Sequence, residues 1–401
     1  MKQIALILGT FIAIFPNVQY LADLRYRVDP SLENSVCHSL MCSDDLLLDS
    51  AKRAIQRTQP NAEVALGNLH EALQRDVISP YRWCDLGQAL RQVGRVEEAR
   101  YCYSRALELG PDSPPILWRI AMFYMRIKEK HSAMKSMSQM LLVVPDYKSV
   151  IFNIYVVNMG NIEETLEYGI PQNRPIAQDY FRYLLRRAAP QDVKTAWDWL
   201  DAHSMVDERL GGEYVDFLIA RRQLPQAADI WKHTVGASDG AYLKSNLVYN
   251  GDFEMEPLQA GLDWKFSDGE GVRIVRDSTV KRSGSSSIRV DFGGNENSNF
   301  NRVSQNLILP AGKYHFSAWL RTADLTTDQG IGFRLVDASG RVATVTKQLI
   351  GTNDWTPVEM DFTPTGPAQL FRVEAFRPPS WKFDNKVNGS AWIDGVSLSR
   401  E

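Results

Sequence analysis

The chain has 401 residues, 44% of them hydrophobic and 23% charged, so it is long enough for two or three domains with cores of their own. Lysine and arginine total 45 against 48 acidic residues, and the net charge of −3 argues against a nucleic-acid-binding protein. Four cysteines are too few for a disulfide scaffold.

The N-terminus carries a long apolar run. Residues 4–15 are almost entirely hydrophobic, and extension past Pro16 to Ala22 gives about twenty residues, enough to span a bilayer. A basic residue ahead of such a run is typical of a secretory signal or an uncleaved anchor, and a buried helix of a cytosolic protein is the alternative. We predict a signal peptide or membrane anchor over 1–30, a linker over 31–45, and a secreted or membrane-anchored protein on the extracytoplasmic face.

Two of the four cysteines follow this segment closely. Cys37 and Cys42 have His38 between them, and in an oxidising compartment they would form a disulfide. Free thiols and a metal site that includes His38 are the alternatives. Cys84 and Cys102 lie in a helical region, where we expect small buried residues.

Residues 46–236 have the apolar periodicity of helices, and two units repeat at a spacing of 34 residues. The first unit has apolar or small residues at Trp83, Leu86, Gly87, Leu90, Ala99, Tyr103, Ala106 and Pro111, and the second at Leu117, Ile120, Ala121, Tyr124, Ala133, Met137, Met140 and Pro145. This pattern resembles the tetratricopeptide repeat, in which small residues let two antiparallel helices approach closely. The resemblance implies an α-solenoid of about five helical pairs.

Such a solenoid offers a concave groove lined by the first helix of each pair. On the 34-residue frame, the groove side carries Tyr81, Cys84, Gln88, Arg91, Trp118, Met122 and Met125. A surface of aromatic and methionine side chains suits a partner peptide or helix. The alternative is that neighbouring helices or the C-terminal domain cover these residues.

The pattern changes at a predicted hinge over 237–245. From 246 to 401, short alternating runs separated by Gly, Asp, Asn and Pro predict an antiparallel β-sandwich, with strands at 287–292, 313–321, 332–336, 371–376 and 390–398. A domain of this size with about eight or nine strands fits a jelly roll. The fold class is therefore multidomain α and β: an N-terminal membrane segment, a helical solenoid and a C-terminal β-sandwich.

The β-region also contains an ordered set of landmarks. NGDFE opens it at 250–254, Trp264 follows, SGSSS at 283–287 precedes a strand, PAGKY at 310–314 leads into another, and AWIDGVSL closes it at 391–398. This order is similar to that of the carbohydrate-binding modules of families 4 and 9. The resemblance covers nearly all of 246–399 and implies a jelly roll that binds glycans, although many relatives bind other ligands.

The same resemblance implies a structural calcium ion. Its ligands would come from Asp252 or Glu254, the Ser283–Ser285 loop (Ser285 in particular) and Asp394, and such an oxygen set suits Ca²⁺. The alternative is that Glu254 and Asp394 are ordinary loop acids bonded to backbone N–H groups.

Strand alternation predicts which side chains face away from the core. Tyr314, Phe316, Ala318 and Leu320 are expected inward, so His315, Ser317, Trp319 and Arg321 are expected outward. In the resembled modules an outward face forms the ligand cleft, which implies that an aromatic ring stacks on sugar and that arginines suit an acidic polysaccharide. The predicted glycan-binding residues are Trp319, His315, Arg321, Arg334, Arg372, Glu374 and Arg289. The alternative is a solvated face of cross-strand ion pairs. Trp264 and Trp392 are expected in the core, and Trp381 either in the core or at a ligand.

Catalytic motifs give little support for an enzyme, because the sequence has no Gly-rich phosphate loop and no His-Glu-x-x-His zinc motif. We therefore predict a non-enzymatic adaptor whose repeats hold a protein partner and whose sandwich binds a glycan, in exopolysaccharide or cell-envelope assembly. A scaffold that binds no sugar and an accessory subunit of a glycan-processing enzyme are the alternatives.

Overall fold

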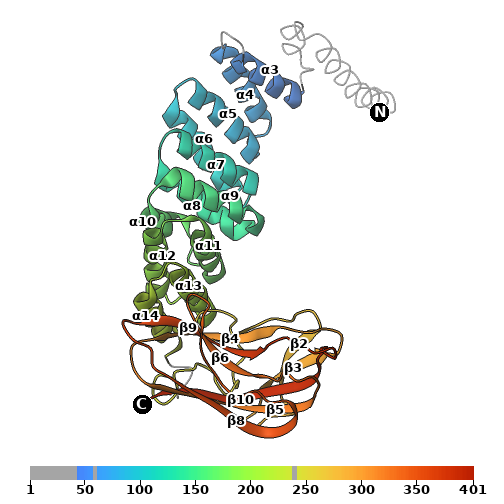
Figure 1. The fold of residues 1–401 in the computed structure, drawn as a ribbon. Coiled ribbons are helices and arrows are strands. Elements are labelled where there is room, and N and C mark those ends of the chain that lie inside the picture. The colour runs from blue at the N-terminus through green and yellow to red at the C-terminus, as the bar shows by residue number, and fades with distance from the viewer. Residues whose placement is uncertain (1–42, 57–60, 237–241) are drawn as a thin grey trace, which may run out of the picture. The chain divides into compact units, whose positions relative to one another are not determined.

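The computed structural model describes residues 43–56, 61–236 and 242–401 (Figure 1). Its contacts divide the chain into two compact units that meet between Trp199 and Leu200. The predicted N-terminal membrane segment and the Cys37–Cys42 pair lie outside the described residues and stay predictions. Within the described ranges, no helix is long and apolar enough to cross a membrane.

Three regular helical pairs begin the described chain. They are α3 (Asp44–Gln56) with α4 (Ala62–Arg75), α5 (Pro80–Gln92) with α6 (Val96–Leu109), and α7 (Pro114–Arg126) with α8 (Lys130–Val143). The small residues of the repeat have the role that was predicted, because a Cβ atom on Gly87 would lie 3.0 Å from the ring of Tyr103. Ala99 and Ala106 of α6 are fully buried in the same core.

The repeat pattern fades after Pro145 because the next helices are wound differently. A 3-10 turn (η2, Pro145–Tyr147) leads into α9 (Lys148–Ile154), which continues as the π-helical η3 (Tyr155–Met159), and α10 (Ile162–Glu164) continues as the π-helical η4 (Thr165–Gly169). The hydroxyl of Tyr155 donates a 2.9 Å hydrogen bond to the carbonyl of Gly169 and joins the two segments. In a π-helical segment the side chains are spaced differently from those of an α-helix, so the residues no longer fall at the positions of the 34-residue frame. Sequence comparison alone therefore does not detect a repeat here.

Regular pairs then resume with α11 (Arg174–Arg187) and α12 (Pro190–Ala202), and α13 (Glu208–Ala220) with α14 (Leu224–Val235). The described helices thus form six pairs, where about five were expected from the solenoid resemblance. The last pair belongs to the C-terminal unit. Gly212 of α13 lies so close to Ala260 that a Cβ atom on Gly212 would be 2.8 Å from the Cβ atom of Ala260. On the same helix, the carboxylate of Asp216 accepts hydrogen bonds from Gly261 N and Lys265 Nζ.

The rest of this unit is a two-sheet antiparallel sandwich. Sheet 1 has the order β1 (Lys265–Phe266), β4 (Phe300–Leu309), β9 (Gln369–Arg377), β6 (Gly332–Asp337), β7 (Val342–Val345). Sheet 2 has the order β2 (Val272–Asp277), β3 (Ser287–Gly293), β10 (Asn388–Arg400), β5 (Tyr314–Leu325), β8 (Gly351–Phe362). Every pair of adjacent strands runs antiparallel.

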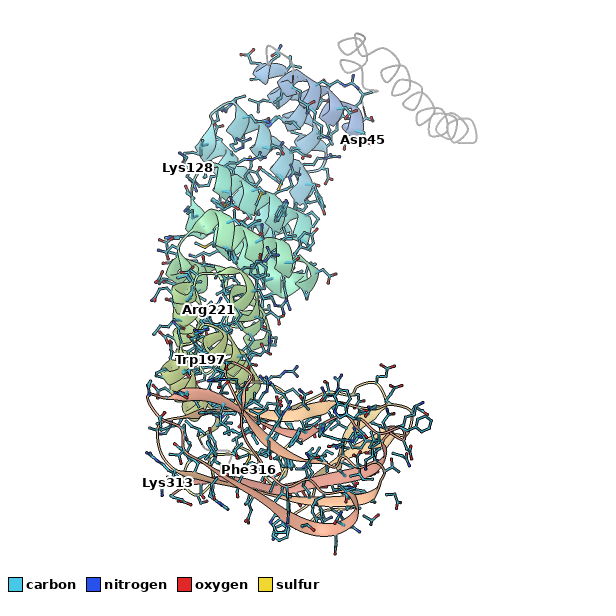
Figure 2. All side chains as sticks on the ribbon, viewed as in Figure 1. Asp45, Lys128, Trp197, Arg221, Lys313 and Phe316 are labelled. Atoms are coloured by element: carbon cyan, nitrogen blue, oxygen red, sulfur yellow. The ribbon has the colours of Figure 1, made fainter. Side chains whose placement is uncertain are left out.

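The apolar core lies between the two sheets. All four residues predicted to face inward from β5 belong to it, and Phe316 lies between the sheets in Figure 2. Trp264 is fully buried there, as expected. The prediction for Trp392 is wrong: its neighbours Ala391 and Ile393 fill the core, so period-two alternation turns Trp392 to the outer face of sheet 2, half-buried.

Candidate functional site

The outer face of sheet 2 holds four of the predicted glycan-binding residues, and three of these four are ionic groups paired with acids of the same face. Arg289 donates from Nη1 to Asp277 and from Nε to Asp291, and Arg321 lies 3.7 Å from the carboxylate of Asp354. Burial acts to raise the pKa of Asp277, but hydrogen bonds from Thr279 and Trp392 outweigh it and hold that pKa well below its usual range. These contacts make the ladder of ion pairs that was the alternative interpretation of this face.

His315 belongs to the same ladder. Its Nδ1 atom lies 2.7 Å from Oδ1 of Asp361 on the neighbouring strand β8. This hydrogen bond, together with the negative charge of the carboxylate, raises the pKa of His315. The imidazole is therefore already engaged by a protein group.

Trp319 faces outward as predicted, but its ring is covered. The guanidinium of Arg282 lies 3.9 Å from the ring centre, a cation–π contact, and Gly395 lies against the ring edge. A sugar could stack on this side of the indole only after displacing Arg282. The structure thus gives Trp319 a protein partner where the sequence predicted an open ring.

The remaining predicted residues lie on the other side of the sandwich. Arg334 is on β6, and Arg372 and Glu374 are on β9, so all three belong to the outer face of sheet 1. The prediction of a single cleft that joins them to Trp319 is therefore wrong, because the core separates the two outer faces. Alternation along a strand distinguishes inside from outside but does not say which sheet the strand joins.

On sheet 1 these three residues form one cluster. Glu374 is 1% exposed, and its Oε2 atom accepts a 2.8 Å hydrogen bond from Nε of Arg334 while Oε1 accepts one from Nε of Arg372. The guanidinium of Arg334 also lies over the ring of Phe376, 5.4 Å from its centre. The register places Glu374 between Ser304 of β4 and Arg334 of β6.

Sequence reasoning missed the neighbours that complete this face. Ser304 and Asn306 of β4 lie opposite Glu374 and Arg372, and Val345 of the edge strand β7 lies opposite Arg334 and is half exposed. Within the described residues the side chains of Ser304 and Asn306 have no hydrogen-bond partner. A signal was present, because Ser304 and Asn306 stand at alternate positions between Val303 and Leu307 of one run.

The predicted calcium ligands surround one loop. Glu254 accepts hydrogen bonds from Ser285 N, Ser285 Oγ and Ser286 N, which lower its pKa, and buried Asp394 accepts them from Arg282 N and Ser283 N. Burial, reinforced by the charge of nearby Asp252, raises the pKa of Asp394. These N–H and O–H contacts match the alternative of hydrogen-bonded loop acids. The described part of the chain contains no group of three or more His, Cys, Asp or Glu residues that could hold a metal ion. Calcium therefore stays a prediction.

In the helical unit, the predicted groove residues share one side of the first helices. Tyr81 and Gln88 are exposed, and the others are half-buried: Arg91, Trp118, Met122 and Met125. Arg119 of α7 donates a 2.7 Å hydrogen bond to Asp85 of α5, at the same position one repeat earlier, and a hollow of about 80 Å³ lies beside Gln88. Cys84 does not line the groove: it is fully buried, and burial raises the pKa of its thiol to about 12.

Comparison with known proteins confirms both resemblances. Residues 80–113 match a tetratricopeptide repeat, and residues 245–380 match the family described as a carbohydrate binding domain. No curated protein matches the chain.

Solved structures similar to this chain include several sugar-binding modules. TmCBM61 in complex with β-1,4-galactotriose is 20% identical, with a TM-score of 0.30 over 39% of this chain and 99% of that chain. The C-terminal family 22 carbohydrate binding module of a Clostridium thermocellum protein is 17% identical, with a TM-score of 0.29 over 40% of this chain and 95% of that module. A family 4 module is 14% identical, with a TM-score of 0.29 over 38% of this chain and 99% of that module. Likeness at this level does not indicate what this chain binds.

Proposed function

We propose that the protein is a non-enzymatic adaptor whose β-sandwich binds a glycan on the outer face of sheet 1 and whose helical repeats bind a protein partner. The match of residues 245–380 to a carbohydrate binding domain supports the first half, and the match of residues 80–113 to a tetratricopeptide repeat supports the second. The observation that favours sheet 1 is that Ser304 and Asn306 lack partners among the described residues and lie in one surface with exposed Val345. Sugars offer hydroxyls and apolar C–H faces, which such a mixed surface can match.

A glycan array probed with the full chain tests the glycan half. Wild type is expected to bind a subset of oligosaccharides, and Asn306→Ala to weaken that binding about two- to tenfold, the usual effect of losing one hydrogen bond. Arg321→Gln is the matched control, because Arg321 lies on the outer face of sheet 2 and should leave affinity unchanged. Loss of binding in Arg321→Gln alone would move the site to sheet 2, and no binding by wild type would favour the scaffold without sugar.

The partner half of the proposal concerns the groove of the helical unit. A photoreactive residue in place of Met125, which lies on the groove side of α7, is expected to crosslink the partner in living cells. The same residue in place of Leu142, which is exposed on the second helix α8, is the control and should not. Equal crosslinking at both positions would place the partner elsewhere.

We further propose that the protein acts in exopolysaccharide or cell-envelope assembly, held at the membrane by residues 3–22 or secreted. The apolar run ahead of the repeats supports this placement. The full chain should pellet with membranes and deletion of residues 3–22 should release it, or the chain should appear outside the cytoplasm without that segment. Recovery of the full-length protein in the soluble cytosol would exclude the placement and, with it, the Cys37–Cys42 disulfide.

A further inference from the structure

Two arginines share one buried acid on the outer face of sheet 1. Arg334 and Arg372 both bond the carboxylate of Glu374, which is 1% exposed, so the cluster has two positive charges for one negative charge. The arginine side chains themselves are 24% and 48% exposed. A net positive charge therefore lies at the surface, on two arginine side chains whose positions are fixed by the buried carboxylate of Glu374.

The way in which the acid is bound leaves the outer ends of both arginines unused. Each guanidinium has five N–H donors, and each donates to Glu374 through Nε. In the described part of the chain, the Nη amino groups of Arg334 and Arg372 have no hydrogen-bond partner. Eight N–H donors, four from each guanidinium, are thus available beside a carboxylate that fixes the position of both groups.

Two other arginines of the sandwich, Arg289 and Arg377, do not share this property. Arg289 donates through both Nε and Nη1 to two acids, and fully buried Arg377 donates through Nε, Nη1 and Nη2 to Gln329 O, Ser298 O and Thr327 Oγ1. The N–H donors of these two arginines therefore bond groups within the folded domain. The arrangement at Glu374 instead resembles a receptor, in which one inner acid orients donors toward an outer ligand.

We propose that Arg334 and Arg372, oriented by Glu374, bind an anionic substituent of the glycan, either the carboxylate of a uronic acid or a sulfate ester. Planar guanidinium groups pair with such oxyanions through parallel N–H···O bonds, and lysine cannot reproduce this geometry. Ser304 and Asn306 on one side are placed to bond sugar hydroxyls, and Val345 on the other side is placed to contact an apolar ring face. This inference rests on the glycan-binding function proposed above and names its substrate class.

The test compares matched polymers on the full chain. Polygalacturonate is compared with its carboxyl-reduced form, and dextran sulfate with dextran, by affinity electrophoresis or calorimetry. Wild type should bind at least one anionic polymer more tightly than its neutral form, by about tenfold or more, and the preference should shrink as salt rises. Arg372→Gln should remove the preference, whereas Arg321→Gln on sheet 2 should keep it. Arg372→Gln leaves Arg334 on Glu374, and an unchanged melting temperature checks that this variant is folded.

The outcomes separate the two proposals. Equal binding of a polymer and its neutral form, or a preference that survives in Arg372→Gln, overturns the anion receptor but leaves glycan binding intact. Binding to no glycan, neutral or anionic, overturns both. Preference for polygalacturonate assigns a carboxylate, and preference for dextran sulfate alone assigns a sulfate.

Discussion

Asp263 should make the C-terminal unit lose stability as pH rises from about 4 to 7. The side chain is fully buried, and burial raises its pKa from the ordinary 3.8 to about 7 although Leu258 N and Trp264 N donate to its carboxylate. The negative charge of Glu208 on α13 adds to the increase. The folded protein thus retains a proton on Asp263 at pH values where the unfolded chain has released it.

The sign and the size follow from this difference. Below the unfolded pKa both states are protonated, so the contribution of Asp263 is fully present; it is lost as pH rises through the folded pKa, because the unfolded state binds fewer protons over that interval. A gap of about three pH units corresponds to ~4 kcal/mol of unfolding free energy. The Asp263→Asn variant stays neutral at every pH and cannot lose this contribution.

Urea unfolding of wild type and Asp263→Asn from about pH 4 to pH 8 measures the effect. The variant should be the less stable protein at the acid end, since an amide replaces one of two acceptor oxygens, and should gain on wild type by up to ~4 kcal/mol by the alkaline end. Asp384→Asn, in an exposed loop, is the control and should show no such trend. A stability difference between wild type and Asp263→Asn that stays constant with pH would refute a protonated buried carboxyl.

Three further predictions concern packing and metal binding. Gly67→Ala in α4 should raise the melting temperature, because a Cβ atom at this position meets nothing within 4 Å. Gly87→Ala in α5 should lower the melting temperature, because the added methyl group would press against the ring of Tyr103. Shifts of the same sign in the two variants would contradict the repeat packing. If calcium binds the Asp394 loop, chelator should lower the melting temperature of wild type but not of Asp394→Asn, because it removes up to ~2.7 kcal/mol of unfolding free energy at 100-fold saturation; a chelator-independent melt would leave only the loop hydrogen bonds. A fragment of residues 204–401 should melt higher than one of 246–401, because α13 and α14 cover Ala260 and Gly261; equal melting would show that this contact is dispensable.

Much of the architecture could be predicted because it depends on local spacing. The 34-residue frame identified Gly87 and the buried alanines of α6, since a close helix contact accepts only small residues at those positions. Strand alternation was equally reliable within β5, where every residue predicted inward lies in the core. Strand β8 was missed because Pro357 interrupts its pattern; the structure tolerates this proline because β8 is an edge strand.

What the sequence could not provide is how separate strands associate. Nothing in the alternation of β5 and β9 indicates that Trp319 and Arg372 belong to different sheets, so the predicted site joined residues from opposite faces. Likewise, the sequence placed a domain boundary after α14, whereas Gly212 of α13 lies against the backbone of Ala260 in the same compact unit. Both points concern contacts between residues far apart in the chain.

The two outer faces of the sandwich differ most in their balance of charge. On sheet 2, Arg289 has two acids, and His315 and Arg321 have one each, so an anionic ligand would have to compete with a carboxylate for each of these three groups. On sheet 1, two arginines have a single acid, and that acid is buried beneath them. The charges of the three groups on sheet 2 are neutralised by protein acids, so an anionic ligand would gain little there. The excess positive charge on sheet 1 is not neutralised by Glu374 and is left to water or to an anion. The charge balance, more than the position of any tryptophan, therefore supports our proposal that the binding face is that of sheet 1.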